Sequence, residues 1–195
     1  MDRKGFIERW QKEERPKSGL AMRLFILAPT QAFEGKEEIG FDIIEKVAEF
    51  FSVSPRAVHS CGSAKLGFSP IKGTAFVEGS SDFDIAIIDS GCFNRYVGKV
   101  IKATNQYKDL TGFSRPEGGS PAYSGFAKYL AKGIFRPDMM PKSDAKKEVD
   151  AFFRELTALH REIFGNISAA IYMSDEAFQM RQSEALGAFG TGASL

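Results

Sequence analysis

The chain has 195 residues and a formal net charge of +1, and 43% of its residues are hydrophobic, including 18 Phe. This composition excludes an intrinsically disordered chain and predicts one domain with a substantial core. A net charge this close to zero gives no overall reason to expect nucleic acid or an acidic membrane as the main partner, and leaves only a local basic patch open.

The first part of the chain predicts helices. Residues 3–14 read as a short polar helix with one apolar side. Residues 20–33 are apolar and ambiguous between a helix and a buried segment, with Pro29 marking a break. This run is interrupted by Arg23 and is too short to span a bilayer, so we expect neither a membrane partner nor a targeting segment. Residues 37–52 show helical spacing of apolar side chains.

Three segments with strand character follow between further helices. The predicted strands lie near 58–61, 83–88 and 167–173, and the predicted helices cover 93–110, 122–132 and 143–164. The stretch 111–121 reads as a flexible connection, and the Gly-rich tail from Gly187 to Leu195 is expected to be mobile. We therefore predict an α/β (α+β) fold for residues 1–195, in which a small mixed sheet packs against helices.

The number and spacing of the cysteines indicate the cellular compartment in which the protein works. Cys61 and Cys92 are the only cysteines in the sequence, too few for a disulfide scaffold, and they form no CxxC motif. This predicts reduced thiols in a cytoplasmic protein.

Two aspartates open the second predicted strand. In an extended strand alternate side chains share a face, so Asp82 and Asp84 point the same way while Phe83 points the other. Their side chains lie roughly 6–7 Å apart along the strand, a spacing that suits carboxylates holding divalent ions about 3.5–4 Å apart. Two like charges this close favour a cation between them. The alternative is that the pair only caps a turn.

Other ligand-binding motifs do not fit. Counted from Asp82, a calcium loop of the EF-hand type requires Gly at its sixth position and Glu at its twelfth, where the chain has Ile87 and Phe93. A phosphate-binding GxxxxGK[ST] motif is absent from the sequence, and no GxGxxG follows a strand.

Gly62 and Ser63 end the first predicted strand and open a short loop or helix. Glycine lets a phosphate approach the backbone closely, and the Ser63 hydroxyl adds a donor. Lys65 is near enough in sequence to add positive charge, which makes these three residues candidates for binding a substrate phosphate. The alternative is a plain strand-to-helix turn capped by Ser63.

Lys72, on the Gly-rich loop that follows, either closes over a substrate or is simply solvated, and we expect it to be solvated. Lys128, Lys132 and Arg136, after the acidic strand, are plausible ligands of a triphosphate, although nothing in their spacing requires it.

The combination of Gly62-Ser63 with Ser81-Asp82-Phe83-Asp84 resembles the DNA polymerase β-like nucleotidyltransferase superfamily. The resemblance covers roughly residues 58–89, with a longer loop between the two motifs than that superfamily usually shows. It implies that Gly62 and Ser63 hold the terminal phosphates of a nucleotide. It further implies that Asp82 and Asp84 are catalytic and bind two Mg²⁺ (or Mn²⁺) ions.

The resemblance also implies a third carboxylate on a later strand. The predicted strand 167–173 offers only Ser168 and Tyr172 as polar residues near the expected place. Asp175 and Glu176 come just afterwards, but they have the pattern of first-turn residues of a helix capped by Ser174.

Three functional hypotheses follow. In the first, a nucleoside triphosphate gives its nucleotide to an acceptor hydroxyl with release of pyrophosphate; the acceptor is a nucleotide, an RNA end, a protein side chain or a small molecule. In the second, a degenerate nucleotidyltransferase fold binds nucleotides and acts through a partner protein. In the third, the aspartates only cap a turn in a structural or interaction domain. The resemblance further suggests a bacterial anti-phage defence or toxin–antitoxin module.

Overall fold

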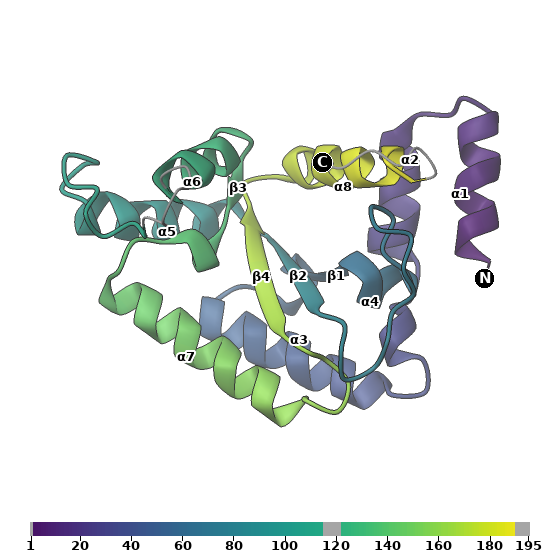
Figure 1. Cartoon of the computed structure of the whole chain (residues 1–195), viewed down its shortest axis with the longest axis horizontal. Coiled ribbons are helices and arrows are strands. Elements are labelled where there is room, and N and C mark those ends of the chain that lie inside the picture. The colour runs from purple at the N-terminus through teal and green to yellow at the C-terminus, as the bar shows by residue number, and fades with distance from the viewer. Residues whose placement is uncertain (1, 115–121, 190–195) are drawn as a thin grey trace.

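The fold is described from a computed structural model, which places residues 2–114 and 122–189. The expected α/β class is confirmed: a mixed sheet is packed between helices (Figure 1). The strands are β1 (Val58–Cys61), β2 (Phe83–Ile88), β3 (Ile134–Phe135) and β4 (Ile167–Tyr172). The helices are α1 (Arg3–Lys12), α2 (Lys17–Ala21), α3 (Glu37–Phe51), α4 (Gly62–Leu66), α5 (Ser90–Ala103), α6 (Ala122–Ala131), α7 (Asp144–Leu159) and α8 (Asp175–Gly187).

Short helical turns connect several of these elements. The π-helix η1 (Met22–Leu27) continues α2, and the 3₁₀ turns are η2 (Gln31–Phe33), η3 (Pro55–Ala57) and η4 (Pro137–Met139). The ambiguous segment 20–33 therefore folds as helical pieces that end at Leu27, before Pro29, and resume at Gln31. Within the described residues, no helix is long and apolar enough to cross a membrane.

The sheet has the strand order β1-β2-β4-β3. β1 pairs antiparallel with β2, β2 pairs parallel with β4, and β3 pairs antiparallel with β4. The three predicted strands are confirmed as β1, β2 and β4. β3 was not predicted, because two residues are too few to show an alternating pattern.

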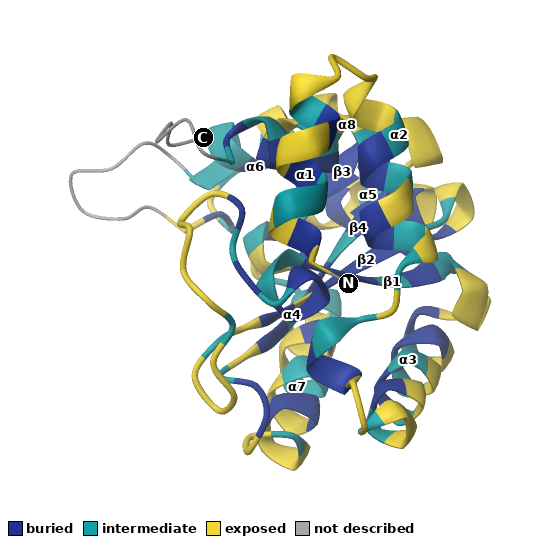
Figure 2. Ribbon diagram, turned by 90° about the vertical axis from the view of Figure 1, so that its right-hand side faces the viewer, coloured by how far each residue is buried: buried dark blue, intermediate teal, exposed yellow. Residues whose placement is uncertain are grey.

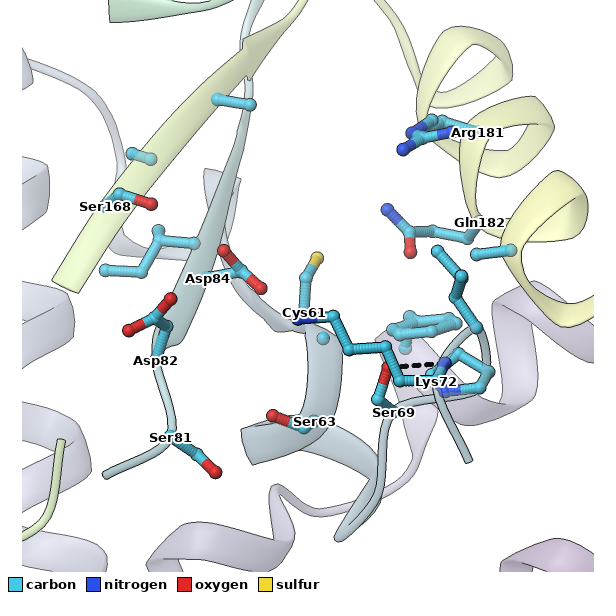
Figure 3. A pocket seen from close by; sticks show the side chains of 18 of the residues that line it. Cys61, Ser63, Ser69, Lys72, Ser81, Asp82, Asp84, Ser168, Arg181 and Gln182 are labelled. Carbon is cyan, nitrogen blue, oxygen red and sulfur yellow. Dashed lines mark hydrogen bonds between the residues drawn. The ribbon is translucent and has the colours of Figure 1, made fainter. Parts of the chain in front are cut away.

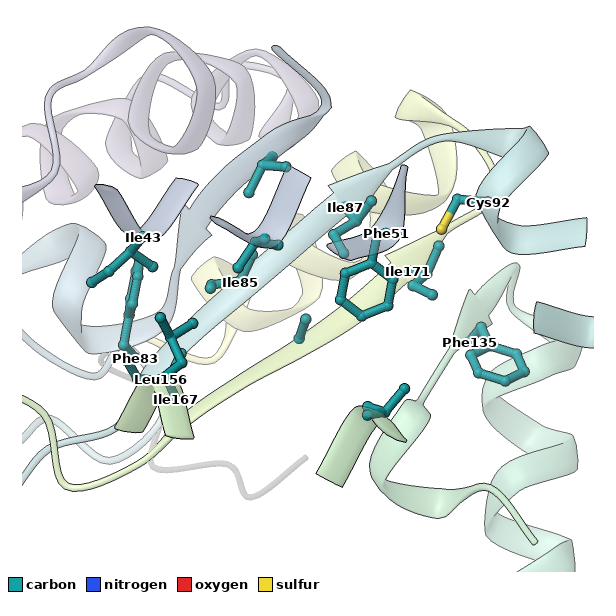
Figure 4. Packing of buried hydrophobic residues seen from close by; sticks show 14 of the residues in the cluster. Ile43, Phe51, Phe83, Ile85, Ile87, Cys92, Phe135, Leu156, Ile167 and Ile171 are labelled. Atoms are coloured by element: carbon teal, nitrogen blue, oxygen red, sulfur yellow. The ribbon is translucent and has the colours of Figure 1, made fainter. Parts of the chain in front are cut away.

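Each face of the sheet is covered by a different set of helices. On β2, Phe83, Ile85 and Ile87 point into a core shared with α3, α5 and α7 (Figure 4). Ala86 on β2 and Tyr172 on β4 belong to the second core, formed with α1, α2, η1 and α8. The burial pattern in Figure 2 follows this division: strands and the inward sides of helices are buried. Asp84 lies on the same face of β2 as Ala86 and is exposed.

Several predicted helix boundaries were wrong. α5 begins at Ser90 rather than 93, because the Asp89 side chain accepts a 2.6 Å hydrogen bond from the amide of Cys92. It ends at Ala103 rather than 110, since Asn105, Gln106 and Tyr107 adopt positive φ angles. The first and the longest predicted helices end at Lys12 and Leu159, a few residues early.

The C-terminal segment begins with a helix that reaches into the predicted tail. α8 continues through Gly187, and the ring of Phe189 lies 5.4 Å from that of Phe68. The tail predicted to be mobile therefore begins inside a helix; its mobility stays a prediction, and its remaining part, 190–195, lies outside the described residues. Most of the predicted flexible connection, 115–121, lies outside them as well.

Candidate functional site

The two sequence motifs meet at one end of the sheet. The antiparallel register pairs Cys61 with Asp84, so that Gly62 follows directly beside the second aspartate. A Cβ atom on Gly62 would clash with the Asp84 carboxylate, which shows how closely the turn approaches the acid. Gly62 has φ +63°, a left-handed conformation that favours glycine. Both the backbone angle and the close approach therefore require glycine here.

Gly62, Ser63, Asp82 and Asp84 line one cavity of about 490 Å³ (Figure 3). Its walls come from β1 and α4, from β2, from β4, from the loop 69–75 and from α8. The volume is within the range of small-molecule sites. Besides the four predicted residues, the cavity presents polar side chains from distant parts of the chain: Ser69, Lys72, Thr74, Ser80, Ser81, Arg136, Ser168, Arg181 and Gln182.

Burial and a neighbouring carboxylate both raise the pKa of Asp84. Asp84 is exposed where it lines the cavity, but the nearby protein still withdraws its carboxyl partly from water. This burial raises the pKa of its carboxyl, and the charge of Asp82 raises it further. Arg136 and Lys72 act in the opposite direction. A cation bound between the aspartates would favour their charged forms, so the site is poised to accept one.

Carboxylate oxygens are the ligands that Mg²⁺ and Mn²⁺ prefer. Asp82 and Asp84 on one strand face, both lining the cavity, fit a divalent ion of this kind. Two divalent ions would need more carboxylate ligands than this pair supplies. Within the described part of the chain, no group of three or more His, Cys, Asp or Glu side chains could hold a metal.

Lys65 does not join the other predicted residues at the cavity. Its side chain is only 5% exposed, and its Nζ donates a 2.6 Å hydrogen bond to the carbonyl of Ala28. Burial lowers the pKa of Lys65 to about 8. Lys72 lines the cavity instead, although it is exposed as expected. Its loop is closed by hydrogen bonds between Ser69 and Thr74 and between Gly73 and Ser69, 2.8 Å each.

The expected place of a third carboxylate is occupied by serine. The parallel register pairs Ser168 of β4 with Asp84 of β2, so both side chains stand on the same face. Asp175 is not among the residues that line the cavity, and its charge acts on His59 instead. It begins α8, which Ser174 caps by accepting a hydrogen bond from the amide of Ala177.

Two cavity residues on α8 were missed from the sequence, whereas Arg136 was among the basic residues considered there as triphosphate ligands. Arg181 and Gln182 project from α8 toward the acids across the cavity (Figure 3), and Arg136 follows β3. Gln182 is buried, and its amide lies 3.5 Å from the Tyr172 hydroxyl. No motif marks Arg181 and Gln182, because α8 has polar residues on all sides.

Comparisons of this chain with family models, with curated proteins and with solved structures find no match.

Proposed function

We propose that this cavity binds a nucleoside triphosphate with Mg²⁺ or Mn²⁺ and transfers its nucleotidyl group to a hydroxyl acceptor. The observation that carries the proposal is the pairing of Cys61 with Asp84, which sets Gly62 and Ser63 beside the acidic pair in one cavity. A phosphate-binding turn and a carboxylate pair at this proximity are what metal-dependent nucleotidyl transfer requires. The resemblance to the DNA polymerase β-like nucleotidyltransferases supports the same reaction.

Each group has a defined task in this reaction. Gly62 and Ser63 would hold terminal phosphate oxygens, because glycine has no side chain to keep a phosphate away from the backbone. Asp82 and Asp84 would hold the divalent ion, which when bound neutralises charge on the phosphates and polarises them. Lys72, at the exposed side of the cavity, adds positive charge for the triphosphate.

The chemical step is a substitution at the α-phosphorus. The acceptor hydroxyl oxygen forms a bond to that phosphorus, and the bond from it to the bridging oxygen of the β-phosphate breaks. Pyrophosphate leaves with the electron pair of the broken bond. The proton of the hydroxyl passes to water at the open side of the cavity. The acceptor is a nucleotide, an RNA end, a protein side chain or a small molecule.

A transfer assay tests the proposal. The protein is incubated with Mn²⁺ or Mg²⁺, α-labelled nucleoside triphosphates and a panel of acceptors, and transferred label and pyrophosphate are measured. We expect product with the wild type and a loss of at least about 100-fold in Asp82→Asn and in Asp84→Asn, since each removes a charged metal ligand. Asp144→Asn, at a side chain that is 90% exposed on α7, is the matched control and should retain activity.

A second candidate function is favoured by Ser168. A hydroxyl opposite Asp84 supplies no third carboxylate, and the site would then bind a metal–nucleotide complex without transferring it. Nucleotide binding that depends on Asp82 and Asp84, with no product from any nucleotide or acceptor, would select this function. If the protein neither binds nor transfers a nucleotide, both candidates are wrong.

A further inference from the structure

The oxygen ligands that line the cavity are too few in negative charge for two divalent ions, and an arginine side chain supplies positive charge beside them. Two-ion sites use several carboxylates to hold metals about 3.5–4 Å apart. Here the neighbouring strand offers the neutral hydroxyl of Ser168 at the position opposite Asp84. A neutral oxygen is a weak ligand for a hard divalent cation compared with a carboxylate.

Arg136 supplies fixed positive charge in the same cavity. It comes one residue after Phe135, which pairs with Ile171 of β4, and it lines the cavity together with Asp84 and Ser168. Its charge acts directly on the Asp84 carboxyl, more strongly than that of Asp138. An arginine in this place repels a second metal ion and attracts phosphate oxygens.

The guanidinium of Arg136 is held in position before any ligand arrives. Nε and Nη2 donate hydrogen bonds of 2.8 and 2.7 Å to the two carboxylate oxygens of Asp138, and the group lies 5.4 Å from the centre of the Tyr129 ring. Within the part of the chain that the structure describes, these bonds use two of its five N–H donors, so that three can donate to a ligand. Holding a planar donor in this way reduces the entropy that binding would otherwise cost.

We propose that the cavity takes a single divalent ion, on Asp82 and Asp84, and that Arg136 provides the second positive charge by binding the nucleotide's phosphate oxygens. The inference rests on the proposed nucleotide site and deepens it. Asp138 is a positioning residue that orients Arg136. Ser168 keeps the neighbouring position neutral, so that no second ion is held there.

Counting bound ions tests the first half of the inference. Mn²⁺ is titrated into the protein with a saturating α,β-methylene triphosphate analogue, and free Mn²⁺ is followed by electron paramagnetic resonance. We expect one bound ion per chain in the wild type and two in Ser168→Asp, which adds the missing carboxylate. Ser168→Asn has a similar size without the charge, and should still bind one. Two ions in the wild type would overturn the inference and leave the proposed function intact.

Nucleotide affinity tests the role of Arg136. We expect Arg136→Met to weaken binding of the analogue about tenfold or more, because it removes a hydrogen bond between opposite charges. Arg136→Lys should restore part of the affinity, and Asp138→Asn should weaken it less than Arg136→Met. Arg56→Met, at an exposed position on η3, is the control. Unchanged affinity in a folded Arg136→Met would overturn the inference, whereas a wild type that binds neither ion nor analogue would overturn the proposed function as well.

Discussion

At the residue scale, the site depends most on Gly62. Its φ of +63° costs an ordinary residue about 1–2 kcal/mol. In addition, a side chain there would push against the carboxylate of Asp84. The same residue thus shapes the turn that offers Ser63 to the cavity and leaves room for the acid.

We expect Gly62→Ala to lose metal binding and to unfold at lower urea concentration. The added methyl displaces the Asp84 carboxylate from the position that a divalent ion requires. Gly35→Ala is the matched control, because Gly35 has a similar φ of +74° but no atom within 4 Å of the added Cβ. Both variants should lose about 1–2 kcal/mol of stability to backbone strain, and only Gly62→Ala should lose Mn²⁺ binding in a titration. Equal Mn²⁺ affinity in the two variants would contradict this account of the turn.

The buried Lys65 should make the free energy of unfolding depend on pH. Burial lowers its pKa in the folded protein from 10.5 to about 8, so between these values the unfolded chain binds more protons than the folded one. The contribution of Lys65 to the free energy of unfolding therefore rises with pH over that window, and the charged form is unfavourable below it. Lys65→Met removes this dependence. Its stability relative to the wild type should be greatest near pH 7.5 and fall as the pH approaches 10.5.

Urea denaturation at pH 7.5, 9 and 10 measures this difference. Lys108→Met provides the control, because Lys108 is exposed, and its stability relative to the wild type should not change over this range. A constant difference for Lys65→Met would mean that the Lys65 ammonium is not desolvated as its burial indicates.

At the scale of elements, alternate side chains at the start of β2 face the core and the cavity: Phe83 is buried in the core, and Asp82 and Asp84 line the cavity. Phe83, between the two aspartates, is fully buried and stacks on Phe164 with ring centres 4.8 Å apart. Phe33 packs edge-on against both rings. This aromatic cluster holds the start of β2 from one face, so the aspartates are presented on the other.

Removing one ring from the cluster should destabilise the whole fold. We expect Phe164→Ala to reduce the free energy of unfolding by about 3–5 kcal/mol, because it leaves a cavity among fully buried rings. Phe41→Ala, at a side chain that is 57% exposed, should change it by less than about 0.5 kcal/mol. Equilibrium urea unfolding measures both, and similar values for the two variants would show that the cluster does not support β2.

At the scale of the whole molecule, the cavity unites segments that are far apart in the chain. Gly62, Asp84, Arg136, Ser168 and Arg181 all line it, from five separate elements or connections. A ligand that contacts all of them binds only the folded chain, so it should stabilise the entire structure.

Thermal unfolding with and without ligand tests this coupling. A ligand at about 100 times its Kd adds roughly 2.7 kcal/mol of stability, which for a chain of this length raises Tm by about 5–11 °C. We expect this shift with Mg²⁺ and a nucleoside triphosphate together, a much smaller one when EDTA replaces Mg²⁺, and none in Asp84→Asn. An equal shift in the presence of EDTA would separate nucleotide binding from the acidic pair.

The sequence by itself determined the features that depend on neighbours along the chain. Strand alternation places Asp82 and Asp84 on the face opposite Phe83, and the helical spacing of apolar residues marks α3 and α7. Gly62-Ser63 was also recognisable from the sequence as a turn between a strand and a helix, because a turn depends on adjacent residues. These are local properties, and the fold preserves them.

Only the tertiary structure decided which of these features meet. The β1–β2 register brought Gly62 beside Asp84, and the parallel β2–β4 pairing set Ser168 where a carboxylate was expected. Packing turned Lys65 toward Ala28 and brought Arg136 and Arg181 to the cavity. Strand pairing and side-chain burial depend on contacts between segments distant in sequence, and no pattern within one segment contains that information.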